Sequence, residues 1–205
     1  MTMKLYGIPG SRTARNIWAF EETGLPYERI DVVMRKGTGT PEFLAINPNG
    51  RIPALVDGDL VLFESLAINS YIAMKSGSDL SPKSLAEGAT SEQWSLWAMT
   101  ETEKPLLRAL FHSLGVMGYE KDPAIVAECM DELARPFEVL DGHLADQDYL
   151  MGGRFTIADL NVASVLAWAA TARLDLSAYS NLDKWLKACL ARDGYQKLRA
   201  IQKAG

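Results

Sequence analysis

The sequence is short of cysteine, histidine and basic residues, and each shortage excludes a class of protein. Its 205 residues include 2 cysteines and 2 histidines, with no Cys-x-x-Cys pair or metal-spaced cluster. Zinc sites, dithiol chemistry and a disulfide framework are therefore not expected. Lys and Arg number 21 against 26 Asp and Glu. The resulting net charge of −5 argues against a protein that follows nucleic-acid phosphates.

Long apolar runs are also missing from the sequence. No segment reaches the roughly 20 apolar residues that span a bilayer, and the first residues lack a signal-peptide pattern. The two cysteines, Cys129 and Cys189, fit a reducing compartment. With 48% apolar and 23% charged residues, the composition is that of a folded globular protein. We expect a cytoplasmic protein without membrane or nucleic-acid partners and without a bound metal.

The chain divides into two parts with different hydrophobic patterning. In residues 1–76 the patterns predict strands at 3–6, 27–33, 54–56 and 60–63, with helices at 11–23, 41–46 and 64–75. This βαβ-ββα order predicts a mixed sheet covered by helices. Residues 77–84 are rich in Gly, Ser, Asp and Pro and are predicted to be a linker. Residues 85–205 show helical patterns only, at 85–117, 123–145, 156–172, 181–191 and 194–203.

Two prolines surround an Asn-Gly pair in the segment Asn47-Pro48-Asn49-Gly50-Arg51-Ile52-Pro53-Ala54-Leu55. This pattern predicts a rigid turn directly before a strand. Pro53 is a candidate cis-proline, because cis bonds occur in tight turns. A cis bond there would leave the Ile52 N–H and C=O free to pair with an extended, peptide-like ligand. The alternative is the start of a hairpin with no function, and the segment alone leaves both open.

Two predicted helix starts are the other candidate sites. At Phe63-Glu64-Ser65, exposed helix N–H groups would bind a carboxylate while Glu64 binds an ammonium, which suits an α-amino-acid head group. Locally, a simple helix cap is favoured over this site. At Gly10-Ser11, the serine is most economically an N-cap residue. Both histidines, His112 and His143, fall in the helical half, so a Ser-His-Asp nucleophile has little support.

Four segments, in this order and spacing, resemble the cytosolic glutathione S-transferase family, in its serine-type (phi- or theta-like bacterial) members. They cover nearly the whole chain: Leu5-Tyr6-Gly7-Ile8-Pro9-Gly10-Ser11 with Arg15, the 47–55 segment, Phe63-Glu64-Ser65, and Phe155-Thr156-Ile157-Ala158-Asp159. The resemblance implies a thioredoxin-like α/β N-terminal domain (1–76) that binds glutathione. It implies an all-α C-terminal domain (85–205) that lines the electrophile pocket. The fourth segment is a Thr-x-x-Asp capping box and is expected to be structural.

The resemblance also assigns roles around glutathione, residue by residue. Pro53 matches the family's cis-proline, and Ile52 matches the residue whose backbone pairs with the cysteinyl part of glutathione. Glu64 and Ser65 match the pair that holds the γ-glutamyl end. Arg51 stands where the family often has Gln or Lys near the ligand. Residues Thr38-Gly39-Thr40 replace a basic pair that grips the glycyl carboxylate in several members, and Arg35 and Lys36 lie upstream, so the glycyl contact is unassigned.

Ser11 matches the hydroxyl that stabilises the glutathione thiolate in serine-type members. Tyr6 is its rival, because other classes use a tyrosine at the end of the first strand, and Thr13 is a more remote candidate. The implied function is conjugation of glutathione to small hydrophobic electrophiles by a homodimeric transferase. Two alternatives stay open: a non-catalytic carrier of hydrophobic ligands, and a glutathione-dependent isomerase, dehalogenase or peroxidase of the same fold.

Overall fold

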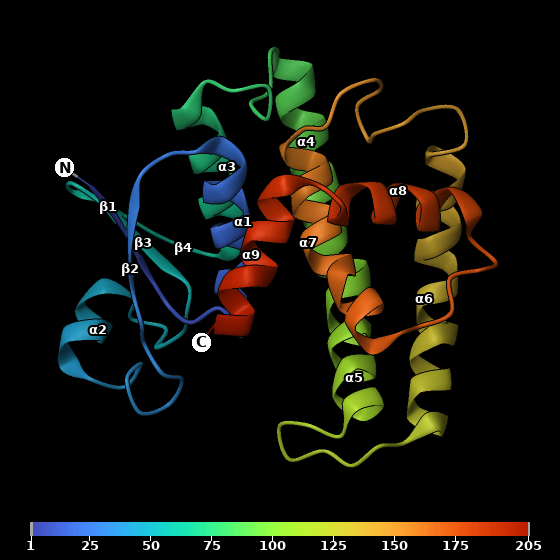
Figure 1. The fold of residues 1–205 in the computed structure, drawn as a ribbon, viewed down its shortest axis with the longest axis horizontal. Helices are drawn as coiled ribbons and strands as arrows, with labels where there is room; N and C mark the ends of the chain where they lie inside the picture. Colours follow the sequence, from blue (N-terminus) through green and yellow to red (C-terminus); the bar gives the residue numbers. More distant parts are fainter. Residues whose placement is uncertain (1, 205) are drawn as a thin grey trace. The chain divides into compact units, whose positions relative to one another are not determined.

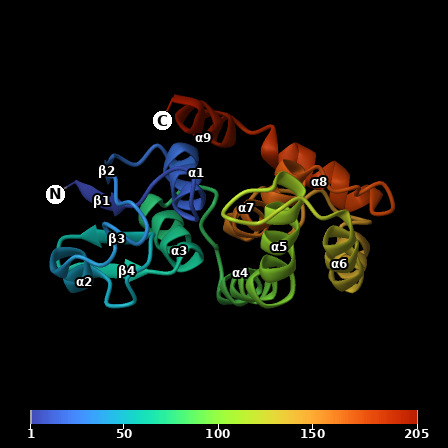
Figure 2. The same ribbon diagram turned by 90° about the horizontal axis from the view of Figure 1, so that it is seen from below.

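The computed structural model describes residues 2–204 (Figures 1 and 2). The chain folds into two compact units. The first consists of Met1–Ser81 together with Arg192–Gly205, and the second consists of Pro82–Ala191. The candidate site lies in the first unit.

The first unit is built on a four-stranded mixed sheet of order β2-β1-β3-β4. β1 pairs in parallel with β2 and antiparallel with β3, and β3 forms an antiparallel hairpin with β4. The parallel pair is joined through a helix, as parallel strands require a long crossover. This arrangement confirms the predicted thioredoxin-like α/β fold. The strands are β1 (Met3–Tyr6), β2 (Tyr27–Ile30), β3 (Ala54–Asp57) and β4 (Leu60–Phe63).

Helices cover both faces of this sheet (Figure 2). α1 (Thr13–Thr23) and α3 (Ser65–Ser76) pack against each other. Their shared core contains the fully buried Leu5 of β1. Successive strand residues point to opposite faces, so Tyr6 faces the other side. There α2 (Pro41–Ile46) buries Phe43 in a cluster that includes Tyr6. β1 and the turn that follows it are thus held from both faces.

The second unit is entirely helical, as predicted. Its central helix, α7 (Ile157–Ala172), is buried on nearly all sides and packs against α4, α5 and α8. A helix that is apolar all round is expected in the middle of a core. The other helices of this unit are α4 (Leu85–Trp97), α5 (Glu103–Leu114), α6 (Pro123–His143) and α8 (Ser180–Leu190).

Several element boundaries differ from the prediction. The single helix predicted over 85–117 is interrupted by η1 (Ala98–Thr102), one turn of π-helix between α4 and α5. Here the Thr102 hydroxyl donates to the Ala98 carbonyl at 2.8 Å, a side-chain bond that competes with regular helix geometry. The strand predicted over 27–33 ends at Ile30, and α1 begins two residues after Ser11.

The last helix also departs from the predicted domain boundary. α9 (Asp193–Ala204) was predicted within the 85–205 domain, but it folds as part of the first unit. The reason is its packing on α1, where the ring centroids of Trp18 and Tyr195 lie 4.9 Å apart. Among the helices of residues 2–204, none is long and apolar enough to cross a membrane.

Candidate functional site

Three predicted segments meet at one edge of the sheet. The strand register aligns Tyr6 with Ala54 and Ala54 with Phe63, in one row across β1, β3 and β4. The Gly7–Ser11 turn, the Ile52-Pro53 bond and Glu64 therefore leave the sheet side by side. Adjacent strands are about 4.8 Å apart, so this row spans about 10 Å, close to the length of an extended tripeptide.

The Ile52–Pro53 peptide bond is cis, as predicted. Both residues are buried, and Ile52 packs in the cluster that holds Phe43 and Ile8. The preceding turn is fixed by Asn47, whose side-chain nitrogen donates to the Arg51 carbonyl at 2.6 Å. The Asn47 side-chain oxygen accepts from the Asn49 N–H at 3.1 Å. No separate role was predicted for Asn47, although an Asn before Pro-Asn-Gly is a signal for an Asx turn.

Glu64 occupies the position before α3 with φ +71°, ψ +113°. A positive φ is uncommon for a residue with a side chain and costs of order 1–3 kcal/mol, typically at functional sites. Within the described residues the Glu64 side chain makes no capping hydrogen bond to α3. The locally favoured interpretation of Glu64 as a side-chain cap is therefore wrong. Its carboxylate is exposed beside the helix start.

A buried arginine supports the start of α3. Arg15, only 2% exposed, donates from Nη1 to the Ser65 hydroxyl oxygen at 3.2 Å. A guanidinium can only donate, so the Ser65 hydroxyl accepts here and its own proton is available for another acceptor. Asn16 donates to the Ser65 carbonyl and to Asn69, each at 2.8 Å. Together with the helix N-terminus, this cation makes the start of α3 a site for a carboxylate.

Arg15 belongs to the first motif of the family resemblance but was given no role, and Asn16 was not singled out at all. The available signal is their position on the inward face of α1, next to the fully buried Ile17 and Trp18. A charged residue is almost never fully buried without a partner. Ser65, the partner of Arg15, is 50 residues away along the chain, so the local sequence around Arg15 does not identify it.

Ser11 lies in the turn between β1 and α1 and is half-buried. Its hydroxyl is within bonding distance of two acceptors, the Ile8 carbonyl at 2.8 Å and the Thr13 hydroxyl at 2.9 Å. It also accepts from the Thr13 N–H at 3.2 Å. The N-cap residue of α1 is Arg12, whose side chain makes no capping bond, so the local expectation that Ser11 is the N-cap residue is wrong. Ser11 lies one residue earlier and bonds within the turn. Because a hydroxyl has one proton, donation to a ligand requires Ser11 to release an internal bond.

The two rivals of Ser11 occupy different surroundings. Tyr6 packs on the α2 side, with its ring centroid 6.3 Å from that of Phe43. Thr13 is fully buried, and its hydroxyl lies where a side chain on Gly7 would be, 2.0 Å from the ideal Cβ position. Gly7 has φ +144°. Only glycine fits this close approach, and Thr13 supports the turn from behind.

In the loop that precedes α2, Thr38-Gly39-Thr40 stands where several family members have a basic pair. Thr38 is buried and its hydroxyl accepts from the Arg35 N–H at 3.1 Å. Arg35 adopts φ +66°, and both Arg35 and Lys36 are exposed. Arg51 is exposed as well. The structure therefore supplies three exposed cations in the two loops that flank α2.

Both parts of the chain match a known protein family. Residues 1–74 match the model of the glutathione S-transferase N-terminal domain, and residues 98–193 match that of the C-terminal domain. Glutathione S-transferase 3 of Zea mays is 38% identical over 209 residues, covering 95% of this chain and 92% of the relative. A probable glutathione S-transferase of Oryza sativa is 34% identical, with 98% and 97% covered.

Solved structures give the same result. Glutathione S-transferase I from maize, in complex with an atrazine glutathione conjugate, superposes with a TM-score of 0.88 at 35% identity and covers 99% of both chains. Glutathione S-transferase III in its apo form has a TM-score of 0.84 at 38% identity, with 98% of this chain and 96% of that chain covered. The chain belongs to the glutathione S-transferase family of enzymes.

Proposed function

We propose that this protein conjugates glutathione to small hydrophobic electrophiles and that Ser11 stabilises the glutathione thiolate, as in serine-type, phi- or theta-like members. The observation that carries the proposal is the row Tyr6, Ala54 and Phe63, which brings the three segments to one edge of the sheet. The relatives support it, since one was solved with a glutathione conjugate. The bacterial origin stays a prediction.

In this proposal the first unit binds glutathione along that edge. The start of α3 and the Ser65 hydroxyl hold the γ-glutamyl carboxylate, and the exposed Glu64 carboxylate holds the ammonium. The backbone of Ile52, beside cis-Pro53, pairs with the cysteinyl residue. Arg51 contacts the peptide near its glycyl end. The thiol sulfur then lies toward the Ser11 turn.

The electrostatic requirement can be compared with what the site supplies. A free thiol has a pKa of about 8.5, and lowering it by two units requires about 2.7 kcal/mol. A hydrogen bond to a charged group contributes about 1.5–3 kcal/mol, and the internal bond that Ser11 releases is worth about 0.5–1.5 kcal/mol. The net gain from Ser11 is thus about 1 kcal/mol. The N-terminus of α1 adds about 0.3–1 kcal/mol. The two contributions together therefore lower the thiol pKa by about 1 to 1.5 units rather than two.

The thiolate formed in this way attacks the electrophile. With a chloroaromatic substrate a carbon–sulfur bond forms and chloride leaves with the bonding electron pair, so no general base on the protein is needed after thiol ionisation. The helical unit is proposed to line the electrophile pocket. An aromatic group at the end of α5 supports this: Tyr119, 48% exposed, stacks on Phe111 and meets His112 edge-on.

Ser65→Ala tests the glutathione site. We expect the KM for glutathione to rise about 10- to 100-fold, because one hydrogen bond to a charged carboxylate is lost. The kcat should stay within a few-fold, since this contact is equal in ground and transition states. Steady-state kinetics with chlorodinitrobenzene measure both. Ser70→Ala, further along α3, is the matched control. A fall in kcat at unchanged KM in Ser65→Ala would contradict the assignment of Ser65. If the native protein binds ligands but shows no turnover with glutathione, the protein is a carrier.

We also propose that the protein is a homodimer. β4 is an edge strand, and its Val61 and Phe63, on one face, are 43% and 44% exposed. Exposed apolar edge strands are typical of association surfaces. Sedimentation should therefore give twice the 22.5 kDa chain mass. Val61→Lys should shift the protein to the monomer mass, whereas Lys4→Glu on β1 should not. A native monomer would exclude the proposal.

The proposed compartment is the cytoplasm, where glutathione is the principal thiol. Cys129 and Cys189 are buried, and neither forms a disulfide within residues 2–204, which supports a reducing environment. Burial raises the pKa of the Cys129 thiol, so this cysteine is expected to be an unreactive core residue.

A further inference from the structure

We propose that Gln202, near the end of α9, is a positioning residue for Ser11. The C-terminal helix would thus act on the thiolate site through the turn that carries the serine. This inference rests on the proposed function of Ser11. It follows from three contacts that α9 and the residue before it make with α1 and the turn that precedes α1.

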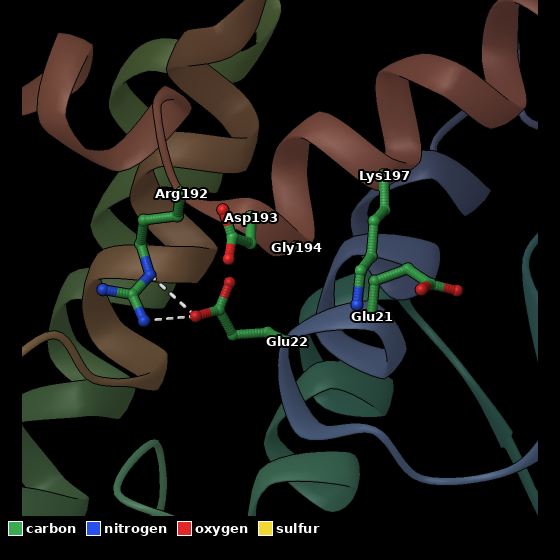
Figure 3. Close-up of a pocket in the computed structure, with 6 residues that line it drawn as sticks. All are labelled: Glu21, Glu22, Arg192, Asp193, Gly194 and Lys197. Carbon is green, nitrogen blue, oxygen red and sulfur yellow. Dashed lines mark hydrogen bonds and ion pairs between the residues drawn. The ribbon is translucent and has the colours of Figure 1, made fainter.

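The first contact fixes the beginning of α9 to the end of α1 (Figure 3). Arg192 forms an ion pair with Glu22, and its Nε donates to Glu22 Oε1 at 2.7 Å. Glu22 Oε2 in turn accepts from the Trp18 indole at 3.3 Å. Gly194 lies so close to α1 that a Cβ would be 3.0 Å from the Glu22 nitrogen. Glu22, Arg192 and Gly194 are among the residues that line a charged crevice of about 470 Å³ at this end of α9.

The second contact is the Trp18–Tyr195 ring pair, and the third is at the opposite end of α9. There the Gln202 side-chain nitrogen donates to the Pro9 carbonyl at 2.8 Å. Arg199 donates from Nη1 to the Gln202 side-chain oxygen at 2.9 Å, which fixes the orientation of the amide. α9 therefore runs antiparallel along α1 and ends on the turn that precedes it.

The Pro9 carbonyl is a sensitive point in this turn. It belongs to the planar peptide unit that joins Pro9 to Gly10, and Gly10 joins that unit to Ser11. Glycine has wide conformational freedom, and a Cβ on Gly10 would meet nothing within 4 Å. Across the turn, Ser11 donates to the Ile8 carbonyl from its N–H at 3.1 Å and from its hydroxyl at 2.8 Å.

The hydrogen bond from Gln202 thus restrains the middle of the turn at Pro9. The bonds from Ser11 to the Ile8 carbonyl join the two ends of the turn. When the Ser11 hydroxyl turns to donate to the thiolate, it gives up its contact with the Ile8 carbonyl or with the Thr13 hydroxyl. The Gln202 contact is outside that exchange and persists. It is the long-range restraint that keeps the Ser11 hydroxyl in place at that moment.

The test compares the thiol pKa of bound glutathione, followed by thiolate absorbance, in native protein and variants. Gln202→Ala should move this pKa toward the value in Ser11→Ala and lower kcat about 3- to 10-fold. Adding Gln202→Ala to Ser11→Ala should produce no further shift, because the two act through one interaction. Gln202→Glu keeps the side-chain length and the acceptor for Arg199 but has no donor for the Pro9 carbonyl, so it should behave like Gln202→Ala.

Arg192→Gln is the matched control at the other end of α9. It weakens the docking of the helix and should lower the melting temperature, but leave the thiol pKa unchanged. If Arg192→Gln and Gln202→Ala change both quantities equally, Gln202 only stabilises the fold and the proposal is wrong. It is also wrong if Gln202→Ala has no effect while Ser11→Ala raises the pKa, and in that case the proposed function stands.

A readout without glutathione separates the two hypotheses. Amide hydrogen exchange of Ser11 and Ala14, which both bond within the turn, should be faster in Gln202→Ala and unchanged in Arg192→Gln. If exchange is faster in Gln202→Ala but Ser11→Ala leaves the thiol pKa unchanged, Gln202 orders the turn and Ser11 does not stabilise the thiolate. If neither responds, both hypotheses are overturned.

Discussion

Replacing Ser11 with Ala is expected to raise the pKa of the bound glutathione thiol by about one unit. This is less than a full charged hydrogen bond would give, because Ser11 must first release its 2.8 Å bond to the Ile8 carbonyl or its 2.9 Å contact with Thr13. The N–H groups at the start of α1 remain in the variant. Part of the thiolate stabilisation should therefore survive.

The rate of conjugation should follow the thiolate fraction. Well below both pKa values, a rise of one unit lowers that fraction about tenfold. Above the pKa of the variant both proteins hold mainly thiolate, so their rates should converge as pH rises. A pH–rate profile of kcat with chlorodinitrobenzene, alongside thiolate absorbance, measures both effects.

Two variants serve as controls for this prediction. Ser11→Thr retains a hydroxyl and should keep the lowered pKa. Tyr6→Phe should leave it unchanged, because Tyr6 packs in the cluster on the α2 side. If Tyr6→Phe raises the pKa and Ser11→Ala does not, the assignment of Ser11 is wrong and Tyr6 is the thiolate donor.

Asp159→Ala is expected to cause the largest loss of stability in the second unit. The Asp159 carboxylate is fully buried and accepts from the Leu150 N–H at 2.8 Å, the Trp185 indole at 3.0 Å and the Thr156 N–H at 2.9 Å. It is also part of the predicted capping box of α7, which the structure confirms. One side chain thus joins α7, α8 and the loop before α7.

Removing it leaves three buried N–H donors without their acceptor, and the Thr156 hydroxyl, which donates to the carboxylate at 2.9 Å, loses its acceptor as well. Each unpaired buried group costs about 1–3 kcal/mol, so the free energy of unfolding should fall by about 3–5 kcal/mol. Urea unfolding, followed by tryptophan fluorescence and circular dichroism, measures this loss. Asp146→Ala, an exposed carboxylate in the loop before α7, should change stability by less than about 0.5 kcal/mol. Equal effects of the two substitutions would contradict the network's importance.

The pH dependence of this contribution has a defined sign. Burial raises the pKa of Asp159 above its ordinary value, against the opposing effect of its hydrogen bonds. The folded protein therefore holds this proton more tightly than the unfolded chain does. The contribution of Asp159 to the free energy of unfolding is fully present below the pKa that this group has in the unfolded chain. It falls as pH rises through the higher pKa of the folded protein, so acid does not remove this contribution. The Asp159→Asn protein should therefore unfold in acid at least as steeply as the native protein. Circular dichroism followed as the pH is lowered measures this.

Local sequence patterns determined much of this protein. The 54–57 and 60–63 hairpin, the Pro-bearing start of α2 and the Thr156–Asp159 box follow from turn, cap and periodicity rules, which depend on neighbours a few residues apart. The motifs at Pro53 and Glu64 predicted a glutathione site, which the variants proposed above test.

Only the tertiary structure decided which distant groups meet. The register that aligns Tyr6, Ala54 and Phe63 depends on strand pairing, and the contact between Arg15 and Ser65 depends on packing of α1 against α3. The return of α9 to α1, with Gln202 on Pro9 across 193 positions, is the most distant of these. Such contacts are selected by the burial of complementary surfaces over the whole chain, and no short window of sequence contains that information.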